Sequence, residues 1–225
     1  MSERDFQGIE LLPATLPVRQ LFILLHGAGR TPPDMLPLAD TLGAAFPQAA
    51  FLLPEGIAAF DGDDSGRQWF SLDGVNDDNR AARIAAAMPA LHALIRQAQD
   101  RLKVMQPDTA LVGFSQGAIM ALEYGIAHDG GVGRVLAFSG RFATLPDRAP
   151  EFTTLHVLHG KDDPIIPVEH AYAAYERLMQ CQGDATLDVA SPVGHELHAA
   201  LVDRAVHRLQ TCIPLRTWKN ALDGA

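Results

Sequence analysis

The stretch that decides the fold is ALVGFSQGAIMAL, residues 110–122. Apolar residues lead into Gly113, and beyond Gly117 they recur with a helical period. A continuous apolar run is typical of a strand buried on both faces, whereas the later spacing favours a helix. A serine between two glycines at such a strand-to-helix junction is the pattern of a nucleophile elbow, a strained turn that exposes the serine. We therefore predict that Ser115 is a nucleophile. The competing interpretation is a structural serine turn.

The same alternation of apolar runs and helical patterns extends along the whole chain. Further apolar runs occupy residues 20–25, 49–54, 134–139, 154–160 and 185–190. Helical patterns occupy residues 35–46, 77–102, 117–128, 168–181 and 197–213. This order predicts an α/β protein with a mostly parallel, doubly wound sheet flanked by helices and without a large lid. Pro89 is expected to kink or divide its helix. We expect one domain over residues 1–225, with residues 215–225 as a candidate loose tail.

Composition and charge exclude several classes of function. The chain has 225 residues and a formal net charge of −9, which disfavours binding to nucleic acid or to an anionic membrane surface. No apolar run reaches the length of a membrane span, and the first residues lack the pattern of a signal peptide, so we expect a cytoplasmic protein. Cys181 and Cys212 fall in helical patterns in register with apolar residues and are expected to be buried, reduced thiols.

A serine nucleophile needs a base and an acid, and on this fold they follow it in the order acid, then histidine. The acid should lie just after the apolar run 154–160, where Asp162 and Asp163 are the two candidates. Pro164 restricts the residue before it to extended conformations, which suits a carboxylate that must hold an imidazole still. We therefore favour Asp163 and keep Asp162 as a turn residue.

The base must come from the histidines that follow this acid, which are His170, His195, His198 and His207. His170 and His207 lie in helical patterns, where packing or exposure to solvent explains them. His195 lies in the loop SPVGHELH, after an apolar run and before the last helix, so it can reach over the serine. His198 is the competitor, three residues further on.

The oxyanion of an acyl-transfer reaction needs two backbone N–H donors. One should be the N–H of the residue after the nucleophile, Gln116, and the other should come from the loop after the first apolar run. That loop reads HGAG, and Gly27 and Gly29 allow its backbone to come close to the serine. We predict Ala28 as the second donor, against the alternative of a plain loop.

Taken together, LLHGAG, GFSQGA, HGKDDPIIP and GHE resemble the phospholipase/carboxylesterase family of α/β-hydrolases, which includes acyl-protein thioesterases. The resemblance covers most of the chain, and GRQWFSLDG, DNRAARI and GFSQGAIMALE are closest to a bacterial esterase subgroup. It implies the α/β-hydrolase fold, a triad of Ser115, Asp163 and His195, and oxyanion donors at Ala28 and Gln116. Many thioesterases of the family have an aspartate where this chain has Ser71, so their activity is not carried over.

Three other patterns do not support a site. Residues 61–72 imitate a calcium loop, but the last position is Leu72 instead of the required glutamate. His156 and His159 could suggest a metal, yet a core histidine is the simpler interpretation because they lie in a buried run. A dinucleotide-binding glycine motif is excluded by Pro32, which stands where its third glycine is needed. We therefore expect no metal and no cofactor.

Apolar residues in the predicted loops at the catalytic end are candidates for an acyl-binding wall, although some could simply cover the core. The candidates are Trp69, Phe70, Ile165 and Ile166, with Phe60 and Phe142 beside them. Arg67 could meet a polar part of the substrate, or it could be an ordinary exposed arginine.

The sequence thus predicts a serine hydrolase that cleaves carboxylic esters of small or medium acyl chains through an acyl-enzyme. Its partner would be a small-molecule ester, with no nucleic acid and no membrane span, and a homodimer is a further expectation. Two alternatives stay open. The same triad could serve an acyl-thioesterase or lysophospholipase, or the chain could be a ligand-binding protein on a hydrolase scaffold.

Overall fold

The computed structural model describes residues 7–63 and 65–218, and it is built on one large sheet. Seven strands lie in the order β1-β3-β2-β6-β7-β8-β9; β1 pairs antiparallel with β3, and the other neighbours are parallel. Their bounds are β1 Gly8–Leu11, β2 Gln20–Leu25, β3 Ala49–Pro54, β6 Thr109–Phe114, β7 Arg134–Phe138, β8 Thr154–Gly160 and β9 Ala185–Ala190. The six predicted strands are confirmed to within one residue.

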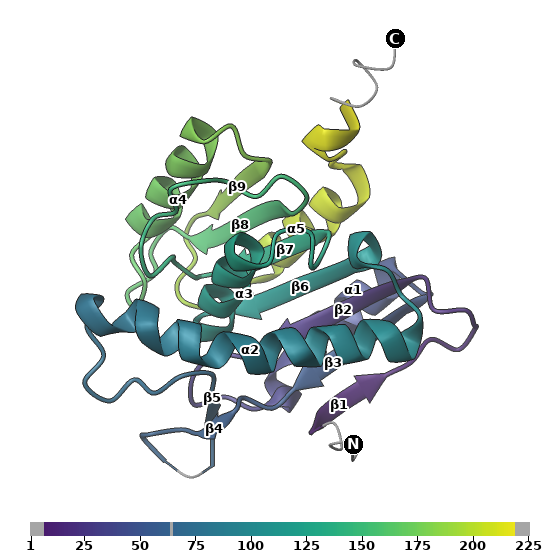
Figure 1. Ribbon diagram of the computed structural model, residues 1–225, viewed down its shortest axis with the longest axis horizontal. Coiled ribbons are helices and arrows are strands. Elements are labelled where there is room, and N and C mark those ends of the chain that lie inside the picture. The colour runs from purple at the N-terminus through teal and green to yellow at the C-terminus, as the bar shows by residue number, and fades with distance from the viewer. Residues whose placement is uncertain (1–6, 64, 219–225) are drawn as a thin grey trace.

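Within residues 7–63 and 65–218, five α-helices of ten or more residues cover both faces of this sheet. They are α1 Leu36–Ala45, α2 Asp77–Leu102, α3 Gln116–Ala127, α4 Glu169–Gln180 and α5 Ala199–Thr211. Buried residues of α2, α3 and α4 join one hydrophobic cluster, and those of α1 and α5 join a second. Figure 1 shows α2 crossing in front of the sheet, with α1 and α5 behind it. The doubly wound arrangement expected for an α/β-hydrolase is therefore confirmed.

The burial of the central strands explains why they were recognisable as continuous apolar runs. Along β2, Leu21, Ile23 and Leu25 belong to the cluster on one face, whereas Phe22 and Leu24 belong to the cluster on the other. Side chains of a strand alternate between faces, so a strand covered on both faces must be apolar at every position.

The segment between β3 and α2 carries the short antiparallel pair β4 (Ala58–Ala59) and β5 (Arg67–Gln68). It projects below the sheet in Figure 1. The pair is too short to be a lid domain, which agrees with the expectation of no large lid. Two short 3₁₀ helices, Pro32–Met35 and Gln106–Asp108, precede α1 and β6.

Some expectations need correction. Pro89 does not divide α2, which runs through it unbroken, and the alternative of a kink at Pro89 stays a prediction. Pro89 lies on the exposed face, so the carbonyl group that loses its partner can turn to water. Cys181 and Cys212 are free, but each lies just past a helix end and is half-buried instead of buried. Within the candidate tail, residues 215–218 are helical, and residues 219–225 lie outside the described part of the chain.

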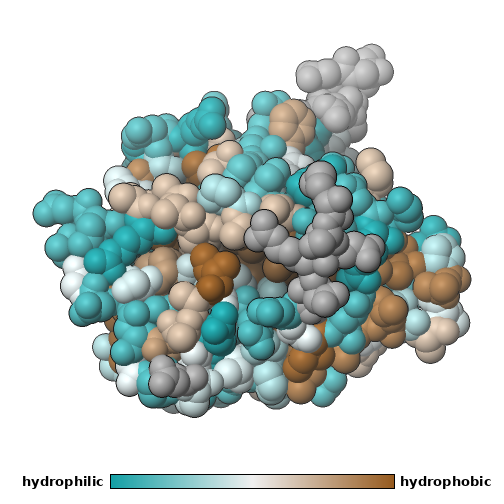
Figure 2. Space-filling view, turned by 60° about the horizontal axis from the view of Figure 1, so that its bottom comes forward, coloured by the Kyte–Doolittle hydropathy of each residue, from teal (hydrophilic) through white to brown (hydrophobic). Residues whose placement is uncertain are grey.

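Among residues 7–63 and 65–218, no helix combines the length and the apolar character needed to cross a membrane. The face drawn in Figure 2 carries hydrophilic residues with hydrophobic patches scattered among them. The largest exposures of big apolar side chains are at Leu16, Ile165 and Met105.

Candidate active site

Ser115 lies in a strained turn between β6 and α3. Its φ of 54° and ψ of −116° are unfavourable for a residue with a side chain. The Ser115 N–H donates to the carbonyl oxygen of Phe138 on the neighbouring strand (2.9 Å). A Cβ at Gly117 would lie 2.6 Å from the carbonyl carbon of Leu25, and one at Gly113 would overlap the carbonyl of Gly117. The two glycines are therefore needed for strand and helix to approach each other, as the elbow pattern predicts.

The structure brings the three predicted triad side chains together. The Ser115 hydroxyl lies 2.9 Å from His195 Nε2, and His195 Nδ1 lies 2.7 Å from Asp163 Oδ2. An ionised carboxylate can only accept, so Nδ1 carries the proton and Nε2 is left to accept from the hydroxyl. The ring of His195 also packs on Phe114, with centroids 5.0 Å apart. This arrangement can take a proton from Ser115.

The Asp163 carboxylate is buried and surrounded by donors. Its Oδ1 accepts the N–H groups of Ile165 (2.8 Å) and Ile166 (2.9 Å), while Oδ2 faces His195 and lies 3.3 Å from His159 Nε2. Burial pushes the pKa of Asp163 up, but the hydrogen bonds from His195, Ile166 and Ile165 outweigh it and hold the pKa below its ordinary value. Asp163 therefore stays charged and can stabilise an imidazolium.

The competing candidates for base and acid, His198 and Asp162, make other contacts. His198 is the N-cap of α5, where its Nδ1 accepts the N–H of Ala200 (3.2 Å). The side chain of Asp162 is exposed, and its backbone N–H donates to the carbonyl of Val193. The structure thus separates His195 from His198, and Asp163 from Asp162, by their contacts.

The two segments that carry the predicted oxyanion donors, the HGAG loop and the start of α3, meet at the elbow. A Cβ at Gly27 would lie 3.2 Å from the Cβ of Ser115, so the HGAG loop touches the elbow. Neither the Ala28 nor the Gln116 N–H donates to any other residue in the described ranges 7–63 and 65–218. Gln116 begins α3, so the positive end of the helix dipole would also stabilise a negative charge placed at its N–H.

The predicted acyl-binding residues differ in exposure. Trp69, Phe70 and Ile166 are buried in the larger core cluster, and Ile165 is 66% exposed. The first three can offer only a small part of their surface to a ligand, whereas Ile165, two residues after Asp163, is open to one. Their role as an acyl wall stays a prediction.

Arg67 and the residues considered for metals have partners within the protein. The guanidinium of Arg67 donates to the carbonyl of Gly56 (3.0 Å) and lies 3.6 Å from Glu55. The Asp61 carboxylate, from the calcium-like stretch, accepts hydrogen bonds from Gln68, Ser71, Leu72 and Asp73. No group of three or more possible metal ligands occurs among the residues that the structure describes.

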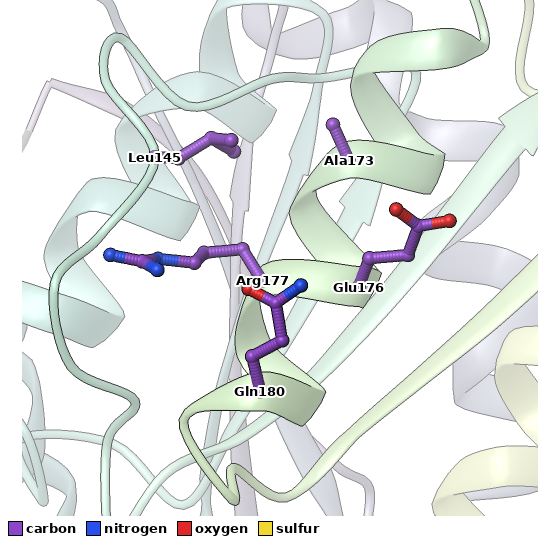
Figure 3. Close-up of a pocket in the computed structure, with 5 residues that line it drawn as sticks. All are labelled: Leu145, Ala173, Glu176, Arg177 and Gln180. Carbon is purple, nitrogen blue, oxygen red and sulfur yellow. The ribbon is translucent and has the colours of Figure 1, made fainter.

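Figure 3 shows a hollow on another part of the surface, between the loop after β7 and α4. It is lined by Leu145, Ala173, Glu176, Arg177 and Gln180. The guanidinium of Arg177 donates to the carbonyl of Pro146 and forms an ion pair with Asp147, so its charge is compensated within the protein. No member of the proposed triad lines this hollow, and its side chains form no catalytic arrangement.

Sequence reasoning missed several residues that shape the site. His159, the ring of Phe114 and the imidazole of His26 all contact a site residue or its neighbouring backbone. His26 and His159 are fully buried, so the sequence pattern alone could not distinguish them from core histidines.

Comparison with known proteins places the chain among esterases. The phospholipase/carboxylesterase family model matches residues 8–213. The chain is 41% identical to esterase YpfH of Escherichia coli strain K12. The match extends over 208 residues, which are 92% of this chain and 89% of that esterase. It is 25% identical over 177 residues to acyl-protein thioesterase 1 of Saccharomyces cerevisiae, covering 72% and 78% of the two chains. The crystal structure of esterase PE8 matches with a TM-score of 0.83 and 28% identity, covering 92% of this chain and 99% of that one.

Proposed function

Since the chain belongs to the phospholipase/carboxylesterase family of α/β-hydrolases, we propose that it hydrolyses carboxylic esters through an acyl-enzyme formed on Ser115. That it is a carboxylesterase follows from the family and from its named esterase relative. The triad, the acyl-enzyme and a preference for small or medium acyl chains are the proposal. The observation that carries it is the pair of hydrogen bonds by which His195 joins Ser115 to Asp163.

The chemistry follows from these contacts. The Ser115 Oγ attacks the ester carbonyl carbon while its proton passes to His195 Nε2. The Ala28 and Gln116 N–H groups hold the resulting oxyanion, and each such donor is worth on the order of 2.7–4 kcal/mol. The C–O bond of the ester then breaks, and the leaving alkoxide takes the proton from Nε2. Asp163 stabilises the intermediate imidazolium throughout.

Water completes the cycle by the same route. His195 takes a proton from the water as it attacks the acyl-enzyme, and it returns that proton to Ser115 as the acid leaves. These groups account for every proton and leaving group, so the proposal uses no cofactor or metal. A small-molecule ester as substrate, a single domain, a homodimer and a cytoplasmic location are carried forward as predictions.

The test is a panel of esters of increasing acyl length, each with the matching thioester, given to the parent and to Ser115→Ala. We expect ester turnover by the parent, highest with small or medium acyl chains, and loss of nearly all turnover in the variant. Faster cleavage of the thioesters would support the thioesterase alternative. If the parent cleaves no member of the panel, the proposal fails, and the alternative of a ligand-binding protein on a hydrolase scaffold is supported.

A further inference from the structure

His26 is a fully buried polar side chain at the end of β2 that the proposed mechanism leaves unused. Its Nε2 lies 3.0 Å from the N–H of Gly56 and accepts from it, so the proton of a neutral ring is on Nδ1. Nδ1 then donates to the carbonyl oxygen of Gly27, 2.8 Å away. Burial lowers the pKa of His26 below its ordinary value, which keeps the ring in this neutral form.

The carbonyl that His26 holds belongs to the same peptide unit as a proposed oxyanion donor. The Gly27 C=O and the Ala28 N–H are fixed in one plane and point in opposite directions. A hydrogen bond that sets the direction of the carbonyl therefore also sets the direction of the N–H. The Arg30 N–H, which closes the turn at 3.2 Å from the same oxygen, is the only other donor that the described residues give it.

The side chain of Gln116, the residue that carries the other proposed donor, is also hydrogen-bonded inside the protein. This amide is buried; it accepts the backbone N–H of Trp69 (2.8 Å) and donates to the carbonyl of Phe70 (2.7 Å). The indole N–H of Trp69 in turn donates to the carbonyl of His26 (2.9 Å). Trp69 thus connects the residue that carries one donor to the residue that orients the other.

We propose that the side chains of His26 and Gln116 are positioning residues that, joined through Trp69, hold the Ala28 and Gln116 N–H groups in the geometry of an oxyanion hole. This inference rests on the proposed function, because it assumes that these two N–H groups stabilise the oxyanion. It adds that the 69–70 segment supports the reaction from within the core, apart from any contact with the acyl chain.

A matched pair of variants separates the two hydrogen bonds of His26. The amide nitrogen of His26→Asn can reach the place of Nδ1 and donate to Gly27. The amide of His26→Gln reaches the place of Nε2 and leaves the Gly27 carbonyl without its side-chain donor. Removing one oxyanion donor typically costs about 10²–10³ in kcat, and misdirecting it should cost at least about tenfold.

We expect His26→Gln to lose kcat with KM unchanged, and His26→Asn to keep most of the kcat that the Gln variant loses. Thermal unfolding checks that both variants are folded. The inference is overturned if His26→Gln has the parental kcat, if both variants lose kcat equally while folded, or if only KM changes.

Gln116→Glu provides a second test that needs neither His26 variant to fold. Its carboxylate would face the carbonyl oxygen of Phe70, and only the protonated acid could donate to it. We expect a lower kcat near neutral pH and a ratio of variant to parent that recovers as the pH is lowered. A parental kcat at every pH, or a loss that never recovers, would contradict the inference.

Two controls separate this inference from the proposed function and from independent structural effects. If Ser115→Ala retains turnover in the same assay, the proposed function itself fails. If Ser115→Ala is inactive but the His26 and Gln116 variants have the parental kcat, only the positioning role fails. In the double variant His26→Gln/Gln116→Glu, a shared network predicts a smaller loss than the product of the two single losses. A loss equal to that product would contradict the connection through Trp69.

Discussion

Substitution of Gly117 by alanine is the most direct perturbation of the elbow on which the site is built. The added Cβ would lie 2.6 Å from the carbonyl carbon of Leu25 and 2.8 Å from the carbonyl oxygen of His26. Carbon atoms in contact normally lie about 3.5–4.0 Å apart, so α3 and β2 must separate by about 1 Å. Overpacking of this kind typically costs about 1–3 kcal/mol of stability. A displacement of about 1 Å between reacting groups can cost about 10²-fold in rate.

The assay is ester turnover measured beside urea denaturation, with Gly43→Ala in α1 as the matched control. A Cβ at Gly43 meets only the ring of Phe51, at an ordinary 3.6 Å. Because alanine favours helix over glycine, this control should gain about 0.5–1 kcal/mol and keep its activity. Gly117→Ala should be destabilised and lose most of its kcat. Parental stability and kcat in Gly117→Ala would refute the reasoning about the close approach.

Two further predictions follow from the charges around the site and in the core. Asp163→Asn should lower kcat by about 10⁴ in a steady-state assay, because the amide no longer fixes the tautomer of His195. Asp162→Asn should retain the parental kcat. Equal effects of the two substitutions would contradict the choice of Asp163 as the partner of His195. Burial holds the pKa of His156 at about 3, so between that value and 6.5 only the unfolded chain takes up its proton. The free energy of unfolding should therefore fall as the pH drops below 6.5, by up to about 1.4 kcal/mol per pH unit for this group. Urea denaturation at a series of pH values should show a shallower fall in His156→Leu than in the parent. An equal slope in the two proteins would exclude His156 as a source of the pH dependence.

The sheet was largely predictable because its central strands are buried on both faces and therefore read as unbroken apolar runs. The antiparallel strand β1 was missed, since it is short, lies at the edge and is mostly half-buried. The two-residue strands β4 and β5 carry no pattern of their own. The behaviour of Pro89 depends on which face of α2 it occupies, and only the packed structure shows that this face is exposed.

The contacts of the candidate triad were predictable because strand ends and chain order left few choices. Pro164 favours Asp163 over Asp162, and a loop position favours His195 over His198. The structure joins the two favoured side chains by a hydrogen bond, whereas His198 contacts Ala200. The positions of Trp69 and Phe70 were harder to predict, because loop residues at the catalytic end can point inward as well as outward. The hydrogen bonds of His26 and Gln116 depend on distant segments, so no local pattern could indicate them.

The central claim, that Ser115 is a nucleophile activated by His195, is tested most directly by labelling with a fluorophosphonate followed by peptide mass analysis. The account predicts one phosphonate adduct on Ser115, formed rapidly in the parent, much more slowly in His195→Ala and at the parental rate in His198→Ala. Labelling of Ser115 that is equally fast with and without the imidazole of His195, or the absence of any adduct on Ser115, would contradict it.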